Sequence, residues 1–179
     1  MCRRSDHVEV RLCIVVTSDS VAYGLKKDEV CPSAQAVVEE LGGELLKCIV
    51  VPNSVPIIVN EVRDCLKLCN FALITGGTGV SEHDLSTDVV KQFEGIELPE
   101  LGELLRVASY STVGVRAFAS RSIAKLVKYP RPALIAAIPG NPNAIRFALR
   151  ILLEDYVPHI LFEFLKKSAA QHILEGNRS

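Results

Sequence analysis

Strand-like and helix-like segments alternate through the first 75 residues of this 179-residue chain, and this alternation constrains the fold more than any other feature. Residues 8–18, 44–51 and 71–75 are rich in apolar, mostly β-branched side chains and end at turn-forming residues, as buried strands do. Between them, residues 33–41 and 56–68 show the apolar spacing of helices, with Ser or Pro at the start of each and Gly after the first. Strands linked by helices predict right-handed βαβ units. The predicted class is therefore α/β, with helices on both faces of a mainly parallel sheet.

The second half of the chain continues this pattern less regularly. Residues 133–138 form another apolar, strand-like run, which stops at Pro139. Residues 85–121 are mostly helical in pattern. The remaining predicted elements are a short strand over 122–129 and helices over 99–109, 143–153 and 159–167.

Length and composition indicate one domain that binds a small molecule or another protein. With 49% apolar residues and no internal repeat or low-complexity linker, the chain can bury a core over residues 1–167, followed by a frayed polar tail over 168–179. The net charge is −1 and the basic residues are scattered, which argues against a nucleic-acid partner and against a membrane partner. No signal peptide or stretch of spanning length is found, so a cytoplasmic location is expected.

The cysteines are expected to be reduced thiols. The six cysteines stand at positions 2, 13, 31, 48, 65 and 69, mostly within apolar segments and without a Cys-x-x-Cys pair. Cys65 and Cys69 share a helix face, but two thiolates without a nearby third ligand make a poor zinc site. Packing is the favoured interpretation for this pair.

Three strand ends carry unusual loops, at residues 17–20, 75–79 and 139–142. The carboxyl ends of parallel strands lie at one edge of a sheet, where ligands bind, so we expect these loops to converge. In residues 75–79, here called the glycine loop, Gly76, Gly77 and Gly79 remove the Cβ atoms that would keep an anion from the backbone, and two threonine hydroxyls add donors. From spacing alone, a phosphate cradle and a simple turn are equally supported, and the two companion loops favour the cradle. The two common nucleotide motifs, G-x-x-x-x-G-K-S/T and G-x-G-x-x-G, are absent from the sequence.

Acidic residues follow the glycine loop at Glu82, Asp84 and Asp88. Such carboxylates could hold Mg²⁺ that bridges phosphate oxygens, because this ion prefers hard oxygen ligands. The alternative is an acidic helix start stabilised by the helix dipole. That alternative is favoured for Asp88, whereas for Asp84 the two interpretations are equally supported. His83 is interpreted as a surface or supporting residue, because no second histidine stands at a ligand spacing.

Residues spread over nearly the whole chain, from about 8 to 163, match one known family in order and spacing. The chain resembles the molybdopterin-binding proteins of the MoaB and MogA type, which include the G domain of gephyrin and the molybdopterin adenylyltransferases. The segment Val157-Pro158-His159 is more similar to the MoaB branch. The matching residues are Ser18, Asp19, Asp28, the glycine loop, Asp84, Gly102, Glu103, Ser120, Arg121 and residues 139–142.

This resemblance implies a three-layer α/β/α fold, a homotrimer or homohexamer, and a cleft for molybdopterin. The implied reaction is adenylyl transfer in molybdenum-cofactor biosynthesis: Mg²⁺-bound ATP donates AMP to the terminal phosphate of molybdopterin and releases pyrophosphate. ATP and molybdopterin would be the substrates, and Mg²⁺ the cofactor. Such a step needs two anions to be positioned and developing charge to be neutralised.

The resemblance also assigns roles to individual residues. Asp84 would be a catalytic carboxylate associated with magnesium. Arg121 and Glu103 fall at family positions too, with simpler interpretations as an interface charge pair and a helix-surface carboxylate. The residues that would line the pterin and nucleotide cleft are Ser18, Asp19, Gly76, Gly77, Thr78, Gly79, Gly140 and Asn141.

Two departures from the family pattern bear on catalysis. Asn53 stands where the family usually has an aspartate that acts with the Asp84 position, so one full charge is lost at this catalytic position. The family's Asp-x-Ser-Gly-Pro loop is replaced by residues 28–32, which lack the hydroxyl and the glycine. A non-catalytic molybdopterin-binding or scaffolding protein is therefore the alternative to the enzyme. A third possibility is that the fold serves another phosphorylated nucleotide or pterin.

Overall fold

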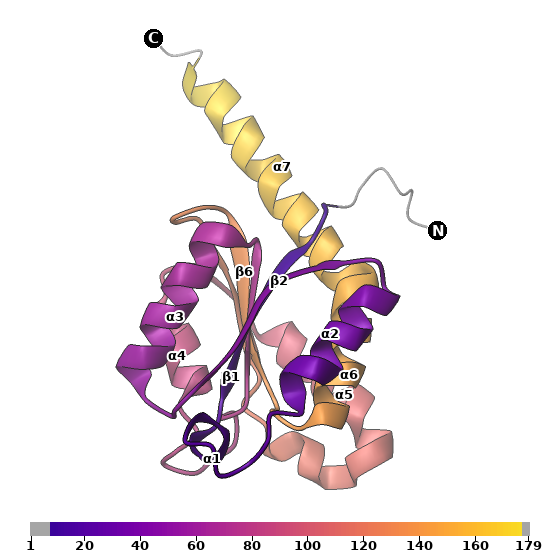
Figure 1. Ribbon diagram of the computed structural model, residues 1–179. Helices are drawn as coiled ribbons and strands as arrows, with labels where there is room; N and C mark the ends of the chain where they lie inside the picture. The colour runs from indigo at the N-terminus through magenta and orange to yellow at the C-terminus, as the bar shows by residue number, and fades with distance from the viewer. Residues whose placement is uncertain (1–7, 177–179) are drawn as a thin grey trace.

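The computed structural model describes residues 8–176, with side chains through residue 166. Its centre is a six-stranded sheet with the order β2-β1-β3-β6-β5-β4, seen edge-on in Figure 1. β2, β1, β3 and β6 run parallel, while β5 is antiparallel to both β6 and β4. The predicted α/β class and mainly parallel sheet are confirmed. The strands are β1 (Arg11–Thr17), β2 (Glu44–Val51), β3 (Phe71–Thr75), β4 (Ile96–Leu98), β5 (Ile123–Val127) and β6 (Ala133–Ile138).

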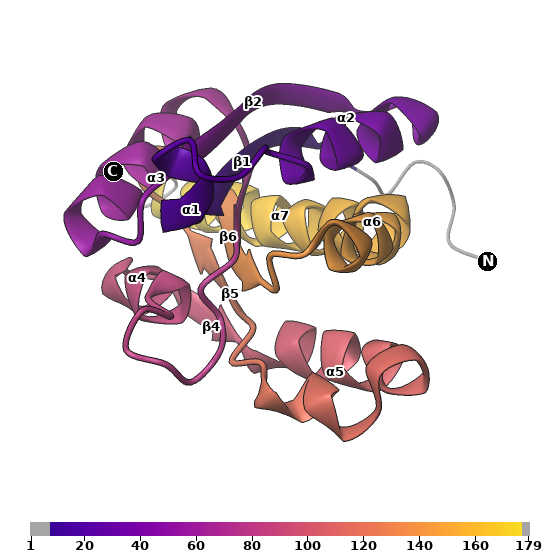
Figure 2. The ribbon, with the colours of Figure 1, turned by 60° about the horizontal axis from the view of Figure 1, so that its bottom comes forward.

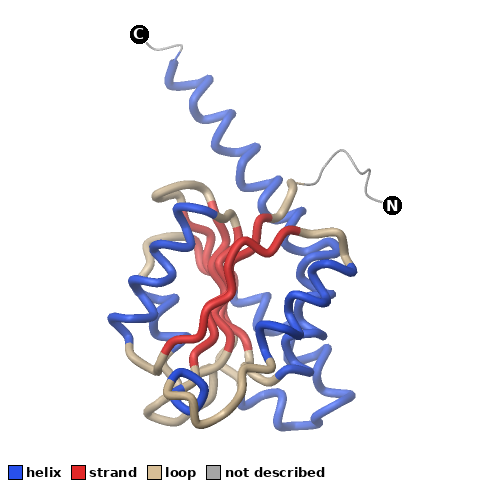
Figure 3. The backbone as a smooth tube through the Cα atoms, viewed as in Figure 1, coloured by secondary structure: helices blue, strands red, loops and turns tan. Residues whose placement is uncertain are grey.

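Helices cover both faces of the sheet, which gives the three layers visible in Figures 2 and 3. α3 and α4 lie on one face, and α2, α5, α6 and α7 lie on the other. α7 projects past the body of the domain at its upper end in Figure 1. The helices are α1 (Asp19–Ala22), α2 (Val30–Glu40), α3 (Val55–Leu68), α4 (Ser86–Gln92), α5 (Pro99–Val113), the 3-10 segment η2 (Gly114–Ala119), α6 (Pro142–Ile151), the π-helical segment η3 (Leu152–Tyr156) and α7 (Val157–Gly176).

The two faces of the sheet bury separate apolar clusters, because successive strand residues point to opposite sides. On β1, Leu12 and Ile14 belong to the cluster under α2, α5, α6 and α7, whereas Cys13 and Val15 belong to the cluster under α3 and α4. β1, β3 and β6 are buried on both faces. Their sequences therefore read as continuous apolar runs rather than as alternating ones.

Two features of the C-terminal half differ from the sequence predictions. Residues 96–98 form strand β4 inside a stretch that was expected to be mostly helical. Glu97 pairs with Lys125 of β5, and their charged groups lie 3.4 Å apart, so a distant partner strand determines this segment. The last helix continues to Gly176 instead of ending at Lys167, and residues 177–179 of the predicted tail lie outside the described residues.

The expectation that all cysteines are reduced is wrong, because Cys31 and Cys48 form a disulfide. Cys31 lies in the first turn of α2 and Cys48 in the edge strand β2. The packing of α2 beside β2 brings their Cα atoms to 5.8 Å, a tertiary contact that cysteine spacing does not reveal.

The remaining described cysteines, Cys13, Cys65 and Cys69, are free thiols with no exposed surface. A hydrogen bond with Cys65 lowers the pKa of Cys13, but the hydrogen bond with Cys69 and burial outweigh it and raise that pKa to about 12. The hydrogen bond with Cys13 and burial also raise the pKa of Cys65. The Cys13 and Cys65 thiols are therefore protonated. All three cysteines pack within the core, as predicted for Cys65 and Cys69.

Across residues 8–176, the helices are all too short or too polar to cross a membrane.

Reduction of the Cys31–Cys48 bond is expected to lower the free energy of unfolding by about 3 kcal/mol, because the bond closes a short loop in the unfolded chain. The two cysteines are separated by 17 positions. Urea unfolding with and without a dithiol reductant measures the change. The Cys31→Ser/Cys48→Ser double variant should not respond to the reductant, and equal midpoints for the wild type in both conditions would contradict the prediction.

Candidate functional site

The loops that follow β1, β3 and β6 meet at the carboxyl edge of the parallel strands, where α1 lies in Figure 1. Gly76 adopts φ 101°, and a Cβ atom there would lie 2.5 Å from the carbonyl oxygen of Thr17. A Cβ atom at Gly140 would lie 2.5 Å from the Gly76 Cα. The Thr75 hydroxyl donates to the carbonyl of Pro139 at 2.9 Å. The predicted convergence of the three loops is therefore confirmed, and glycine is required at both points of closest approach.

Several donors of the glycine loop are already used within the protein. The Gly76 N–H donates to the Ile138 carbonyl at 3.0 Å, and the Gly79 N–H donates to the carboxylate of Asp84. Within the described part of the chain, the N–H groups of Gly77 and Thr78 donate to no protein acceptor. These two N–H groups are the backbone donors that the loop can offer to an anion.

The two threonine hydroxyls of the glycine loop differ in what they can offer to a ligand. Thr75 has no exposed surface and its hydroxyl is bound to Pro139. Thr78 is also buried, and its hydroxyl accepts from the Ser120 hydroxyl at 3.4 Å. Both hydroxyls tie the loop to its neighbours. The expectation of a ligand donor is wrong for Thr75, whose hydroxyl proton is already donated, whereas Thr78 keeps its own hydroxyl proton and stays a predicted donor.

The carboxylate of Asp84 closes the turn that follows the glycine loop. Its Oδ2 accepts from the Ser81 N–H at 2.9 Å. Partial burial would raise the pKa of Asp84, but hydrogen bonds from Ser81 and Gly79 and the positive charge of Arg121 together lower it below its usual value. Asp84 is therefore ionised at neutral pH and is oriented by its own turn.

Asn53 holds the carboxylate of Asp19. The Asn53 N–H donates to Oδ1 at 2.8 Å, and the side-chain Nδ2 donates to Oδ2 at 3.1 Å. The backbone bond first, and the side-chain bond second, lower the pKa of Asp19 below its usual value. The Asn53 Oδ1 is buried and has no hydrogen-bond partner within the described part of the chain. An aspartate at this position would place two negative carboxylates in contact, and they would repel each other. The amide of Asn53 instead donates a hydrogen bond to Asp19.

Ser18 and Asn141 act as helix caps at the same edge of the sheet. The Ser18 hydroxyl accepts from the Val21 N–H at 3.4 Å, and the Asn141 Oδ1 accepts from the Ala144 N–H at 2.8 Å. These bonds position the first turns of α1 and α6 beside the glycine loop. A role of the two side chains in lining a ligand cleft stays a prediction.

The oxygen atoms at this edge suit magnesium chemically. Asp19 and Asp84 supply carboxylates, and the unpartnered Oδ1 of Asn53 is a further hard ligand. Among residues 8–176, no three His, Cys, Asp or Glu side chains are grouped so that they could hold a metal ion by themselves. A Mg²⁺ ion would therefore share its coordination with phosphate oxygens and water, as a nucleotide-bound ion does. Asp84 as a metal ligand stays a prediction.

Arg121 contributes more to this region than the sequence indicated. Its guanidinium lies between the Asp84 turn and Asp88 in α4, and contacts both. A family position was the only sequence signal for this residue, because no pattern in a single sequence relates residue 121 to residues 79–88. Arg121 forms an ion pair with Asp88 of the same chain, at 3.2 Å, and a charge pairing at a subunit interface stays a prediction.

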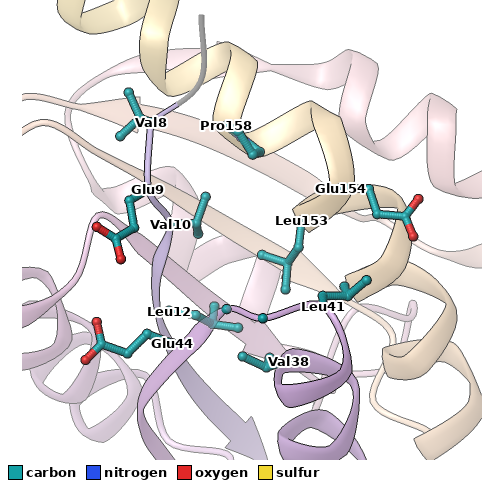
Figure 4. Close-up of a pocket in the computed structure, with 12 residues that line it drawn as sticks. Val8, Glu9, Val10, Leu12, Val38, Leu41, Glu44, Leu153, Glu154 and Pro158 are labelled. Carbon is teal, nitrogen blue, oxygen red and sulfur yellow. The ribbon is translucent and has the colours of Figure 1, made fainter. Parts of the chain in front are cut away.

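Two surface hollows flank the domain. The larger, of about 380 Å³, lies between the start of β1, the end of α2 and the start of α7, as Figure 4 shows. It is at the amino end of the strands and contains none of the predicted site residues. The other, of about 350 Å³, is lined by Val80, Ser81, Glu82, Asp84, Leu85, Asp88 and Arg121. The loop contacts and the ionised carboxylates place the candidate site at the carboxyl end, beside the second hollow.

The Asn53→Asp substitution is expected to reverse the pH dependence of the stability that positions 19 and 53 contribute to the fold. Two facing carboxylates raise the folded-state pKa of the pair above its unfolded value, so stability present at low pH is lost as the pH rises through that pKa. Relative to the wild type, the variant should therefore lose stability between about pH 4 and pH 7. Thermal unfolding across this pH range measures the effect.

Asn60→Asp, which adds the same charge at an exposed position of α3, is the matched control. Parallel stability curves for the wild type and Asn53→Asp would disprove the proposed contact between positions 19 and 53. Millimolar Mg²⁺ should stabilise Asn53→Asp more than Asn60→Asp, because a cation relieves the repulsion.

Gly140→Ala is expected to lower the free energy of unfolding by about 1–3 kcal/mol, because the added methyl group meets backbone atoms of Gly76 that cannot move aside. Gly24→Ala is the comparison, since its Cβ would meet no atom within 4 Å although φ is +74°. Urea unfolding should show the larger loss for Gly140→Ala. An equal or smaller loss would mean that the loops are not packed as described.

Comparisons with known proteins agree with this geometry. Residues 13–159 match a family model described as a probable molybdopterin binding domain. Molybdenum cofactor biosynthesis protein B of Staphylococcus aureus is 28% identical over 159 residues, which cover 88% of this chain and 93% of the relative. Molybdopterin adenylyltransferase of Pyrococcus furiosus is 26% identical over 149 residues, which cover 83% and 87%.

Solved structures show the same fold. The tungsten cofactor synthesizing protein MoaB of Pyrococcus furiosus superposes with a TM-score of 0.71 at 26% identity, over 96% of this chain and 98% of that one. The molybdopterin biosynthesis enzyme MoaB of Thermus thermophilus gives a TM-score of 0.74, also at 26% identity, over 85% and 94%. The chain therefore belongs to the family of probable molybdopterin-binding domains and is a MoaB-like protein of molybdenum-cofactor biosynthesis.

Proposed function

We propose that this protein transfers AMP from Mg²⁺-bound ATP to the terminal phosphate of molybdopterin. The observation that carries the proposal is the meeting of three strand-end loops around Gly76 and Gly140, close to the ionised carboxylates of Asp19 and Asp84. The Pyrococcus relative named molybdopterin adenylyltransferase supports it.

The proposed step is a phosphoryl-centre substitution. An oxygen of the molybdopterin phosphate attacks the α-phosphorus of ATP and forms a new P–O bond. The bond from the α-phosphorus to the oxygen that bridges to the β-phosphate breaks, and this oxygen leaves with its electron pair as part of pyrophosphate. Nucleophile and leaving group are both phosphate anions, so the protein positions charges and forms no covalent intermediate.

The chain's own groups divide this task. The N–H groups of Gly77 and Thr78 would bind phosphate oxygens, since they are the free donors of the glycine loop. Asp84 and Asp19 would hold Mg²⁺ of the incoming nucleotide, and this ion when bound would neutralise charge on the phosphates. Without a cation the carboxylates would repel the same phosphates, so chelation of divalent ions should abolish transfer.

The second candidate function is non-catalytic binding of molybdopterin. Asn53 favours this function, because a neutral amide stands where the family resemblance implies a second carboxylate. The hydrogen bonds from Asn53 to Asp19 hold this amide in place. In this case the glycine loop would still bind the phosphate, while transfer would be slow or absent.

We also propose that the protein self-associates as a trimer or hexamer, which sedimentation or light scattering would test. An apolar surface on α5 and η2 supports this, because single domains expose few such clusters. Figure 2 shows α5 at the outer side of the domain. The exposed side chains are Leu104, Val107, Tyr110, Val113, Val115 and Phe118.

Incubation with molybdopterin and Mg²⁺-ATP labelled at the α-phosphate tests the enzyme directly. The wild type should incorporate AMP, and Asp84→Asn should reduce kcat by about a hundredfold or more, because it removes a charge that stabilises the transition state. Asp64→Asn, an exposed carboxylate on α3, is the matched control and should retain full activity.

The same assay separates the two candidate functions. No turnover by the wild type, with turnover gained in Asn53→Asp, would reject the enzyme and support the binding protein. Thermal shift identifies the ligand, since a compound at about a hundred times its Kd adds about 2.7 kcal/mol of stability. A shift with another nucleotide but none with molybdopterin would reject both.

A further inference from the structure

Arg121 connects the two ends of the turn between the glycine loop and α4. Its Nε donates to the Gly79 carbonyl at 2.6 Å, and its Nη2 donates to the Asp84 carbonyl at 2.5 Å. Its Nη1 donates to the carboxylate of Asp88, in the first turn of α4, at 3.2 and 3.3 Å. One planar side chain therefore sets the separation of Gly79, Asp84 and α4.

The backbone of Arg121 is anchored on the sheet side. Its N–H donates to the Thr78 carbonyl at 2.8 Å, and its carbonyl accepts from the Thr87 hydroxyl at 2.8 Å. Thr78 and Thr87 are buried, and β5 begins two positions later at Ile123. The turn that Arg121 holds is exposed, with Val80 81% accessible. A fixed base thus supports a turn whose own hydrogen bonds are local ones, among Ser81, His83 and Asp84.

The guanidinium has little capacity left for a ligand. Each of its three nitrogen atoms already donates to an acceptor of the protein. Among the described residues, one N–H of Nη2 has no protein acceptor, but turning the guanidinium toward a phosphate would break its bonds to the Gly79 and Asp84 carbonyls. Its contacts therefore suit the support of the turn rather than direct contact with substrate.

We propose that Arg121 is a positioning residue, which holds the Asp84 carboxylate at the proposed AMP-transfer site by clamping its turn against the glycine loop. The inference rests on the proposed function for its catalytic consequence. Within the clamped turn, the N–H groups of Gly79 and Ser81 bind the Asp84 carboxylate, so the shape of the turn determines where this carboxylate points. Arg121 acts on the reaction through Asp84 alone.

Hydrogen–deuterium exchange tests the clamp without any ligand. In Arg121→Ala, amides of residues 79–86 should exchange about tenfold faster or more, while the strands keep their wild-type protection. Arg131→Ala is the matched control, because the Arg131 Nη1 also donates to a backbone carbonyl, that of Leu68, at 3.3 Å, on an exposed side chain remote from the site. Wild-type exchange over residues 79–86 in Arg121→Ala would overturn the proposal.

Kinetics tests the consequence for the reaction. Arg121→Ala should lower kcat for AMP transfer by about a hundredfold, because a displacement near 1 Å at a reacting group has an effect of this order. KM for ATP should stay within about threefold, because the free donors of Gly77 and Thr78 remain. Arg121→Lys keeps the charge but cannot span all three partners, so its kcat should stay at least about tenfold below the wild type.

The outcomes separate positioning from general stability and from the proposed function. A kcat loss that matches the unfolded fraction measured by circular dichroism, or full activity in Arg121→Lys, would overturn positioning by geometry. If Arg121→Ala does not fold, Arg121→Lys is expected to show the faster exchange in residues 79–86, and its absence would count against the clamp. A wild type without AMP transfer would reject the proposed function, while the exchange measurement would still decide whether Arg121 holds the turn.

Discussion

The close approach of the backbone beyond β3 to the backbone beyond β6 is the constraint on which the candidate site depends. The two strands are paired in parallel through Thr75 and Ile138, so their chains leave the sheet side by side. A Cβ at Gly140 would lie 2.5 Å from the Gly76 Cα, which only glycine permits. This contact, and that of Gly76 with Thr17, bring three loops from distant parts of the sequence within reach of one ligand.

Hydrogen bonds within the protein stabilise the negative charges of the carboxylates at this edge. Asp19 is held by Asn53 on one loop, and Asp84 is held by Ser81 and Gly79 on another. Each carboxylate is ionised because N–H donors stabilise its charged form. Under the proposed function, a cation would be needed between these carboxylates and the phosphates. Binding would then depend on the glycine loop, and turnover on the carboxylates.

Asn53 and Arg121 each hold one of the two carboxylates of the candidate site. The family resemblance implies an aspartate at position 53. Asn53 instead donates two hydrogen bonds to Asp19, so the absence of that charge is accompanied by local order. Arg121, just before β5, fixes the turn of Asp84 through its bonds to the Gly79 and Asp84 carbonyls. The two residues act on different carboxylates, so their effects on stability and turnover can be measured separately.

The sequence by itself determined the class of fold and most of its elements. Apolar runs and the residues that begin and end helices are local features of the sequence. β3 and β6 were therefore predicted with the bounds that the structure has, and α2 and α3 within a few residues. The glycine loop and the Pro139-Gly140 turn were recognised because their backbone conformations require Gly and Pro, and this requirement is local to the sequence. Asp84 was singled out through its nearness to the loop in sequence and through the family resemblance.

Tertiary structure alone decided the features that join distant residues. β4 exists because β5 offers it a partner, and the Cys31–Cys48 bond exists because α2 packs beside β2. The pairing of Asn53 with Asp19, and the clamp formed by Arg121, join positions 34 and up to 42 residues apart. No local pattern encodes such pairs, because the free energy of each contact appears only when the sheet has brought its two segments together.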